Sequence, residues 1–401
     1  MNPRSLFLVA SAAACTCVMA LGACANDGGT LVVEEPRAEE SVPGSDSGID
    51  ADGDAAALCT GDCEYFPDDC APDAFCSNGP FDPSTIGGAL NLRTRINVVR
   101  GRSQSDVWVA GAVGTLAHFD GTSWTRTPSD TKETLQTIWL RDSEEVAFGR
   151  LDVLYSRGGA LPDAGAPSAG GWAPRTIDAF PPEWHYLPVR VTAAWAPPGA
   201  EWLWMATDPA YAYRGLWRLR VTPSGTYELA VGASTDLCLA FSACEVTSLH
   251  GSSASELWAV GLTGTTVRIT DAQSGSPSTK VFNSRTWNAL RGVWEASASD
   301  AWAVGAAGTI RHYTGDALFW EVVNDVPTTE NLNAIWGTSS SDIWVVGDNA
   351  VILHYDGKTW SRVKVARLGA RRPDLTTVWA AAPGHVWVGG EGVVLSLGGK
   401  P

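Results

Sequence analysis

The stretch AIWGTSSSDIWVVGDNAVILHYDGKTW, from Ala334 to Trp360, gathers residue types that enzymes use for proton transfer and nucleophilic attack. It holds Asp342, His354 and Asp356 together with a run of serines. A histidine or carboxylate can act as a general base, and a serine becomes a nucleophile when such a base takes its proton. By itself, the stretch would indicate an active site.

The same residues recur elsewhere in the chain, however. VVRGRSQSDVWVAGAVGTLAHFDGTSW (98–124) matches this stretch nearly position for position, and histidines equivalent to His354 stand at His118 and His312. A catalytic base is needed once, whereas a residue repeated along the chain is structural. We therefore interpret His354 as a half-buried histidine that hydrogen-bonds a neighbouring turn. The acidic residue before the second strand is interpreted as a turn-capping carboxylate. It recurs as Asp106, Glu144, Glu256, Asp300 and Asp342.

The repeats predict the fold. The position of Trp344 is occupied in successive copies by Trp108, Val146, Trp204, Trp258, Trp302, Trp344 and Trp387. Seven units of about 45 residues indicate a repeat architecture. Within a unit, DIWVVG alternates like a strand, and Asp356-Gly357 is typical of a hairpin turn. We predict an all-β fold, a single seven-bladed β-propeller of four-stranded antiparallel blades over residues 86–401. The last copy lacks its fourth strand, and we expect Ile86–Arg95 to supply it.

A family resemblance supports this interpretation. Asp120-Gly121-x-x-Trp124 and Asp356-Gly357-x-x-Trp360 resemble the Asp-box (BNR) hairpin, although each is one residue shorter than D-x-G-x-T-W. Over about residues 90–401, the units also resemble the Trp-rich propeller repeats of secreted myxobacterial-type lipoproteins and the assembly-factor propellers of photosystem II biogenesis. Members of this broad set bind ligands, assemble complexes or hydrolyse sugars. The resemblance therefore implies the fold and leaves the activity open.

The N-terminus reads as an export signal and a lipid anchor. Residues 1–23 combine Arg4 with an apolar run, and Leu21-Gly22-Ala23-Cys24 resembles a bacterial lipobox, which makes Cys24 the predicted lipidated residue. We expect a protein anchored to the bacterial cell envelope, at the outer membrane and facing the periplasm or the surface. The alternative is ordinary signal-peptidase cleavage at Ala23-Cys24-Ala25, which would give a soluble secreted or periplasmic protein.

An acidic linker and a cysteine-rich segment follow. Residues 24–58 are predicted to be disordered, because they are acidic and too poor in apolar residues to form a core. Residues 59–85 are predicted to form a small disulfide-stapled segment. Six cysteines remain after the signal and Cys24, and three disulfides are expected among them: one between Cys238 and Cys244, and two of open pairing among the other four. The six are Cys59, Cys63, Cys70, Cys76, Cys238 and Cys244.

Charge and motifs exclude several functions. Residues 25–85 carry a net charge of −14, so almost all of the formal charge of −16 precedes the predicted propeller. An acidic tail without a basic patch argues against nucleic acid as a partner. There is no P-loop, G-x-G-x-x-G, H-E-x-x-H or G-x-S-x-G motif. The cysteine spacing fits zinc ribbons poorly, and Asp50-Ala51-Asp52-Gly53-Asp54 lacks later ligands of a calcium loop. We expect no cofactor, no metal and no enzymatic activity.

The segments that depart from the repeat are the predicted ligand-binding region, because function on a repeat scaffold concentrates in its variable loops. Their aromatic and basic side chains suit a sugar or an extended peptide, although the same residues would also pack the core of divergent blades. The candidates are Trp184, His185, Tyr186, Tyr211, Tyr213, Arg214 and Trp217. The predicted function is a monomeric, non-catalytic binding platform for protein or glycan. The alternatives are an assembly factor for an envelope complex and a carbohydrate-active enzyme.

Overall fold

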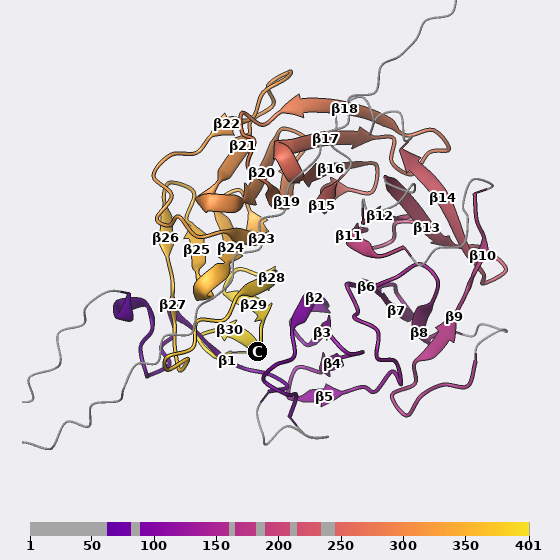
Figure 1. The fold of residues 1–401 in the computed structure, drawn as a ribbon, viewed down its shortest axis with the longest axis horizontal. Coiled ribbons are helices and arrows are strands. Elements are labelled where there is room, and N and C mark those ends of the chain that lie inside the picture. The colour runs from indigo at the N-terminus through magenta and orange to yellow at the C-terminus, as the bar shows by residue number, and fades with distance from the viewer. Residues whose placement is uncertain are drawn as a thin grey trace, which may run out of the picture. The chain divides into compact units, whose positions relative to one another are not determined.

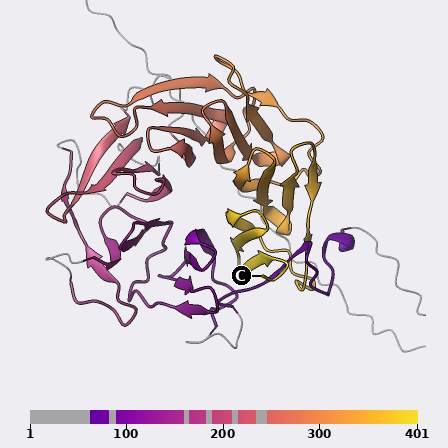
Figure 2. The same cartoon turned by 180° about the vertical axis from the view of Figure 1, so that it is seen from behind.

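A computed structural model describes residues 62–81, 89–159, 165–181, 189–208, 215–233 and 245–400. Seven sheets, antiparallel except for one strand pair in each of two of them, follow one another around a ring (Figure 1), and the view from behind shows the same arrangement (Figure 2). The predicted seven-bladed β-propeller is confirmed. In the described part of the chain, no helix is long and apolar enough to cross a membrane.

Five blades follow the four-stranded pattern. Blade one is β2 (Ile96–Ser103), β3 (Asp106–Gly111), β4 (Leu116–Phe119) and β5 (Trp124–Arg126). Blade two is β6 (Thr137–Leu140), β7 (Glu144–Phe148), β8 (Leu154–Gly158) and β9 (Ala173–Arg175). Blade four is β15 (Val246–Ser253), β16 (Glu256–Gly261), β17 (Thr265–Thr270) and β18 (Ser278–Asn283). Blade five is β19 (Leu290–Ser297), β20 (Asp300–Gly305), β21 (Ile310–Tyr313) and β22 (Glu321–Val322). Blade six is β23 (Leu332–Ser339), β24 (Asp342–Gly347), β25 (Ile352–Tyr355) and β26 (Trp360–Arg362).

Blades three and seven carry a fifth strand. Blade three has the order β10 (Ile177–Ala179), β14 (Tyr227–Ala233), β13 (Leu216–Val221), β12 (Leu203–Thr207) and β11 (Val191–Trp195). Blade seven has the order β27 (Lys364–Val365), β1 (Ala74–Ser77), β30 (Val393–Leu397), β29 (His385–Gly390) and β28 (Leu375–Ala382). Four short 3₁₀ turns complete the described elements, η1 (Cys63–Tyr65), η2 (Leu262–Gly264), η3 (Ala306–Gly308) and η4 (Asp348–Ala350).

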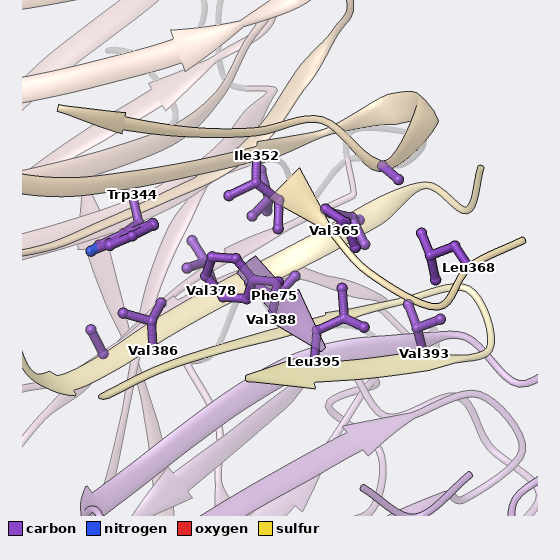
Figure 3. Packing of buried hydrophobic residues seen from close by; sticks show 14 residues of the cluster. Phe75, Trp344, Ile352, Val365, Leu368, Val378, Val386, Val388, Val393 and Leu395 are labelled. Atoms are coloured by element: carbon purple, nitrogen blue, oxygen red, sulfur yellow. The ribbon is translucent and has the colours of Figure 1, made fainter. Parts of the chain in front are cut away.

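The ring is closed by a strand from the cysteine-rich segment. β1 pairs antiparallel with β30, with Phe75 opposite Leu397, and parallel with β27. Closure between the two ends of the chain was predicted, but its assignment to Ile86–Arg95 is wrong, because residues 89–95 form no strand in the described chain. The physical reason is burial. The side chain of Phe75 is fully buried beside Trp344 (Figure 3), whereas Leu92 is 57% exposed.

Neighbouring blades are also joined by a ring of hydrogen bonds around the channel. Polar side chains near the start of the innermost strands donate to a backbone carbonyl of the next blade. The bonds run from Asn97 to Leu135, Thr192 to Val246, Thr247 to Leu290, Asn333 to Leu375, and Thr376 to Ile96. The last of these links blade seven to blade one. Because each bond satisfies a backbone acceptor at a blade boundary, this ring fixes how the inner strands meet.

Candidate functional site at the mouth of the central channel

The residues that resemble an active site form a structural cluster. Asp342 Oδ1 accepts hydrogen bonds from Trp344 Nε1 (2.9 Å) and His354 Nε2 (2.8 Å), and the imidazole stacks on the Trp344 indole with centroids 4.0 Å apart. Burial would raise the pKa of Asp342, but hydrogen bonds from His354 and Thr338 outweigh it and hold that pKa below its ordinary value. The acceptor of the histidine is thus the carboxylate before the second strand. The histidine and the carboxylate, which we interpreted separately from the sequence, form a hydrogen bond with each other.

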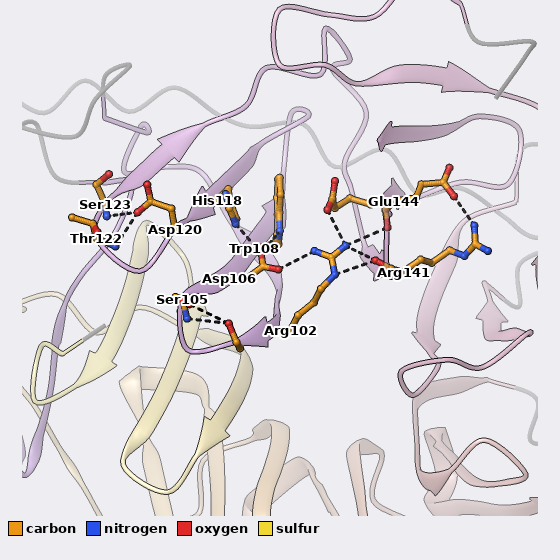
Figure 4. A network of polar contacts seen from close by, with 12 residues as sticks. Arg102, Ser105, Asp106, Trp108, His118, Asp120, Thr122, Ser123, Arg141 and Glu144 are labelled. Carbon is orange, nitrogen blue, oxygen red and sulfur yellow. Dashed lines mark hydrogen bonds and ion pairs between the residues drawn. The ribbon is translucent and has the colours of Figure 1, made fainter. Parts of the chain in front are cut away.

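The same cluster recurs in blades one and five. Its members are Asp106, Trp108 and His118 in blade one, and Asp300, Trp302 and His312 in blade five. Figure 4 shows the copy in blade one beside Arg102, which donates to Asp106 (3.0 Å) and reaches the carbonyl of Arg141 in blade two. A constellation present three times around the ring joins strands and blades, in agreement with the prediction that these residues are structural.

A different position of the repeat faces the channel. On each innermost strand, one residue lies opposite the second-strand position of Trp344, and we call it the ring position. Its seven occupants are Arg100, Trp139, Trp195, His250, Trp294, Trp336 and Trp379. Space for these tryptophans comes partly from glycines of the adjacent blade. A Cβ on Gly337 would lie 2.6 Å from the Trp294 indole, and one on Gly101 would lie 2.5 Å from Trp379. Five of the seven ring positions thus carry tryptophan, and two do not.

A cavity of about 400 Å³ lies at the end of the channel that the ring position faces, and we call it the mouth cavity. Its volume falls within the range of small-molecule and peptide side-chain pockets, about 300–1,000 Å³. Blades two and three supply much of its wall. Their inner strands β6 and β11 are shorter than the eight-residue inner strands, and β11 is followed there by Pro197 and Pro198. The indoles lining it are those of Trp139, Trp195, Trp336 and Trp379.

Arg100 lies at the floor of the mouth cavity, where a second, narrower and mainly polar cavity continues into the channel. Its guanidinium carbon is 4.8 Å from the centroid of the Trp336 ring, and its Nη1 donates to the carbonyl of Val99 at 2.8 Å. Burial lowers the pKa of Arg100 to about 10, so the side chain remains a cation at neutral pH. Among the described residues, no carboxylate pairs with it.

His250 lines the same two cavities and packs against the same indole, with its ring 5.0 Å from that of Trp336. Its Nδ1 accepts a hydrogen bond from the backbone N–H of Glu295 at 3.1 Å. Burial, and then the charge of Arg100, lower the pKa of His250 to about 3, so the imidazole is neutral at physiological pH. With Nδ1 as an acceptor, the proton of the neutral ring is on Nε2.

The candidate ligand-binding residues from the sequence mostly fall outside the described residues. Trp184, His185, Tyr186, Tyr211, Tyr213 and Arg214 lie there, as do Cys24, Cys59, Cys238 and Cys244. Trp217 is described and is 4% exposed, packed with Trp139 and Leu219 between blades two and three. It is therefore a core residue and does not offer a surface to a ligand. Cys70 and Cys76 form a disulfide, and Cys63 is disulfide-bonded as well.

Sequence reasoning missed Arg100 and His250, although a signal was present. When the repeats are aligned, these two residues stand where the other five units have tryptophan. The site offers apolar surface and hydrogen-bond donors. In the part of the chain that the structure describes, no group of three or more histidine, cysteine or acidic side chains could hold a metal ion.

Comparison with known proteins supports the fold alone. No family model matches the chain, and no curated protein sequence matches it. Among solved structures, it resembles YCF48 bound to a D1 peptide, with 15% identity, 76% of this chain and 91% of that chain covered, and a TM-score of 0.55. It also resembles virginiamycin B lyase from Staphylococcus aureus, with 12% identity, 76% of this chain and 94% of that chain covered, and a TM-score of 0.55. The WD40 propeller of Doa1 is similar as well, with 11% identity, 76% of this chain and 92% of that chain covered, and a TM-score of 0.52. The neighbours thus include an assembly-factor-like propeller, an enzyme and a WD40 domain.

Proposed function

We propose that the protein is a non-catalytic binding platform whose propeller receives part of a protein partner in the mouth cavity. The observation that carries the proposal is the convergence of four indoles, a cation without a carboxylate partner and a neutral imidazole donor on one cavity. Aromatic and arginine side chains in a preformed concavity are typical of binding hot spots. The peptide bound to the structurally similar YCF48 shows that another propeller of this shape accepts a peptide.

The binding proposal is tested with purified protein on arrays of random peptides and of glycans. Leu140→Arg places a long charged side chain at the wall of the mouth cavity, and Val322→Arg places one on an outer strand whose Val322 is 43% exposed. We expect wild type and Val322→Arg to bind a common set of peptides, and Leu140→Arg to bind them at least tenfold more weakly, with the same thermal unfolding midpoint. Equal binding by Leu140→Arg contradicts the proposal. Release of a cleaved product from any glycan would instead favour the enzyme alternative.

The proposed location is the bacterial envelope, with the propeller held there by acyl chains on Cys24. One acyl-modified terminus holds a protein to a membrane surface without crossing it. Growth with a clickable fatty-acid analogue should label the wild-type protein and leave Cys24→Ala unlabelled, with the variant recovered in soluble fractions. Cys17→Ala, within the predicted signal, is the matched control and should keep its label. Label retained by Cys24→Ala would rule out this anchor.

A further inference from the structure

This inference rests on the proposed function and concerns the chemical class of the ligand. The mouth cavity carries two unlike kinds of surface. Its wall is mainly apolar, formed by indoles, prolines and Leu203, although Arg102 and Asp142 also line it, and its floor presents Arg100 and His250. Both floor residues occupy the ring position, where the repeat elsewhere places tryptophan, so their polarity is a departure from the structural pattern.

Arg100 has fewer partners than the paired arginines Arg102 and Arg220. Arg102 pairs with Asp106 at 3.0 Å and with Glu145 at 2.8 Å, and Arg220 pairs with Glu201 and Glu228. The only hydrogen bond of Arg100 to a described residue goes to the adjacent carbonyl of Val99. A partly buried cation without a counter-ion is unfavourable. Its remaining donors are thus available to an anion that enters the cavity.

His250 adds a second donor of fixed direction. Because Nδ1 is occupied by the Glu295 N–H, the Nε2–H of the neutral ring is the group left for a ligand. Arg100 and His250 both contact Trp336, at 4.8 and 5.0 Å from its ring centroid, so the two donors lie on one patch of the floor. Each can donate to a separate oxygen of one planar anion.

We infer that the mouth cavity binds a carboxylate attached to an aromatic or branched apolar group, with the carboxylate on Arg100 and His250 and the apolar group between the indoles. A guanidinium matches the two oxygens of a carboxylate, and such charge-assisted hydrogen bonds are stronger than neutral ones. The apolar walls favour a ligand whose remaining part is apolar over a hydrated sugar. The carboxylate can belong to the C-terminus of a peptide or to a free small acid.

Three probes test this inference by isothermal titration calorimetry at neutral pH. They are acetyl-Gly-Ser-Gly-Phe with a free carboxylate, the same peptide as its C-terminal amide, and 3-phenylpropionate. We expect at least one of the two acids to bind at least tenfold more tightly than the amide. Tighter binding of the peptide acid than of phenylpropionate identifies a chain terminus as the source, and the reverse order identifies a small acid.

The variant Arg100→Gln should bind the acid and the amide equally, while Arg220→Gln, which removes a paired arginine on β13 of blade three, should keep the tenfold difference. Unlike the loss of a structural arginine, Arg100→Gln should not lower the thermal unfolding midpoint of the free protein, because it removes a charge that no carboxylate compensates. A retained tenfold difference in Arg100→Gln overturns the inference.

Other outcomes separate this inference from the proposed function. The carboxylate site is overturned if the wild type binds neither the peptide acid nor 3-phenylpropionate at least tenfold more tightly than the amide. Selective peptide capture on the arrays, lost in Leu140→Arg, would still support the platform in that case. Conversely, acid-selective binding together with an empty peptide array supports the carboxylate site and overturns the proposal of a protein partner.

Discussion

Phe75→Ala should lower the free energy of unfolding by about 3–5 kcal/mol, the usual cost of truncating a fully buried phenylalanine. Phe75 is 0% exposed and lies on β1, the strand that closes the ring, with its ring 5.5 Å from that of Trp344 in an edge-on arrangement. Alanine would leave a cavity and would also weaken the attachment of β1 to blade seven. Urea denaturation followed by tryptophan fluorescence measures the change.

Two further variants make the Phe75 result specific. Phe75→Leu keeps most of the buried volume and should lose much less stability than Phe75→Ala. Trp287→Ala removes a larger aromatic side chain that is 88% exposed, and such a surface change is expected to stay within about 0.5 kcal/mol. If Phe75→Ala unfolds at the same urea concentration as the wild type, β1 does not hold the ring closed.

The blades were predictable because their sequence signal is local and repeated. The alternation in DIWVVG and the Asp356-Gly357 turn specify a strand and a hairpin within one unit, and the period specifies how many units follow. The closing strand was not predictable in the same way. Ala74–Ser77 has four residues in an acidic, cysteine-rich setting, and its partner β30 lies at the other end of the chain. Pairing over that separation leaves no local pattern to detect.

The sequence predicted the region of the candidate site, but not the residues that form it. Blades two and three depart from the repeat, and their short inner strands do help to form the mouth cavity. Trp217, the candidate residue from the sequence that the structure describes, is buried in the core. Aromatic type alone does not separate a binding residue from a packing residue, since both bury apolar area. Arg100 and His250 were the stronger indication of a binding site. A charged or polar side chain does not improve packing at a position that holds tryptophan in the other five blades.

A third residue that departs from the repeat pattern lies behind the floor of the mouth cavity. Glu295 follows the ring position in blade five, where the equivalent residues of blades one and six are Gly101 and Gly337. Its side chain is 2% exposed, Oε2 accepts from the Ser252 N–H at 2.6 Å, and Oε1 is buried without a partner in the described chain. Burial, with the charge of Glu256 adding to it, raises the pKa of Glu295 to about 7 against the hydrogen bond from Ser252.

Glu295→Gln should therefore remove a pH-dependent destabilisation. An unfolded glutamate loses its proton near pH 4.5, whereas the folded protein holds that proton until about pH 7. The wild type consequently loses stability as the pH rises between these values, and the penalty is complete above pH 7. The stability of Glu295→Gln relative to the wild type should increase by about 3 kcal/mol between pH 4 and pH 8, because burial raises the pKa of Glu295 from 4.5 to about 7 on folding.

Comparing the two pH values makes the Glu295→Gln result independent of any constant cost of placing an amide in the buried site, because such a cost is the same at both. Urea denaturation at pH 4, 6 and 8 gives the three stability differences. Glu321→Gln, on the outer strand β22, is the matched control, since Glu321 is exposed and its variant should show no pH-dependent difference from the wild type. A Glu295→Gln difference that stays constant from pH 4 to pH 8 would mean that Glu295 has the same pKa in the folded and the unfolded protein, and so is ionised in the folded protein at neutral pH. The protein would then have to stabilise a carboxylate behind His250, next to the donors that we assign to the ligand.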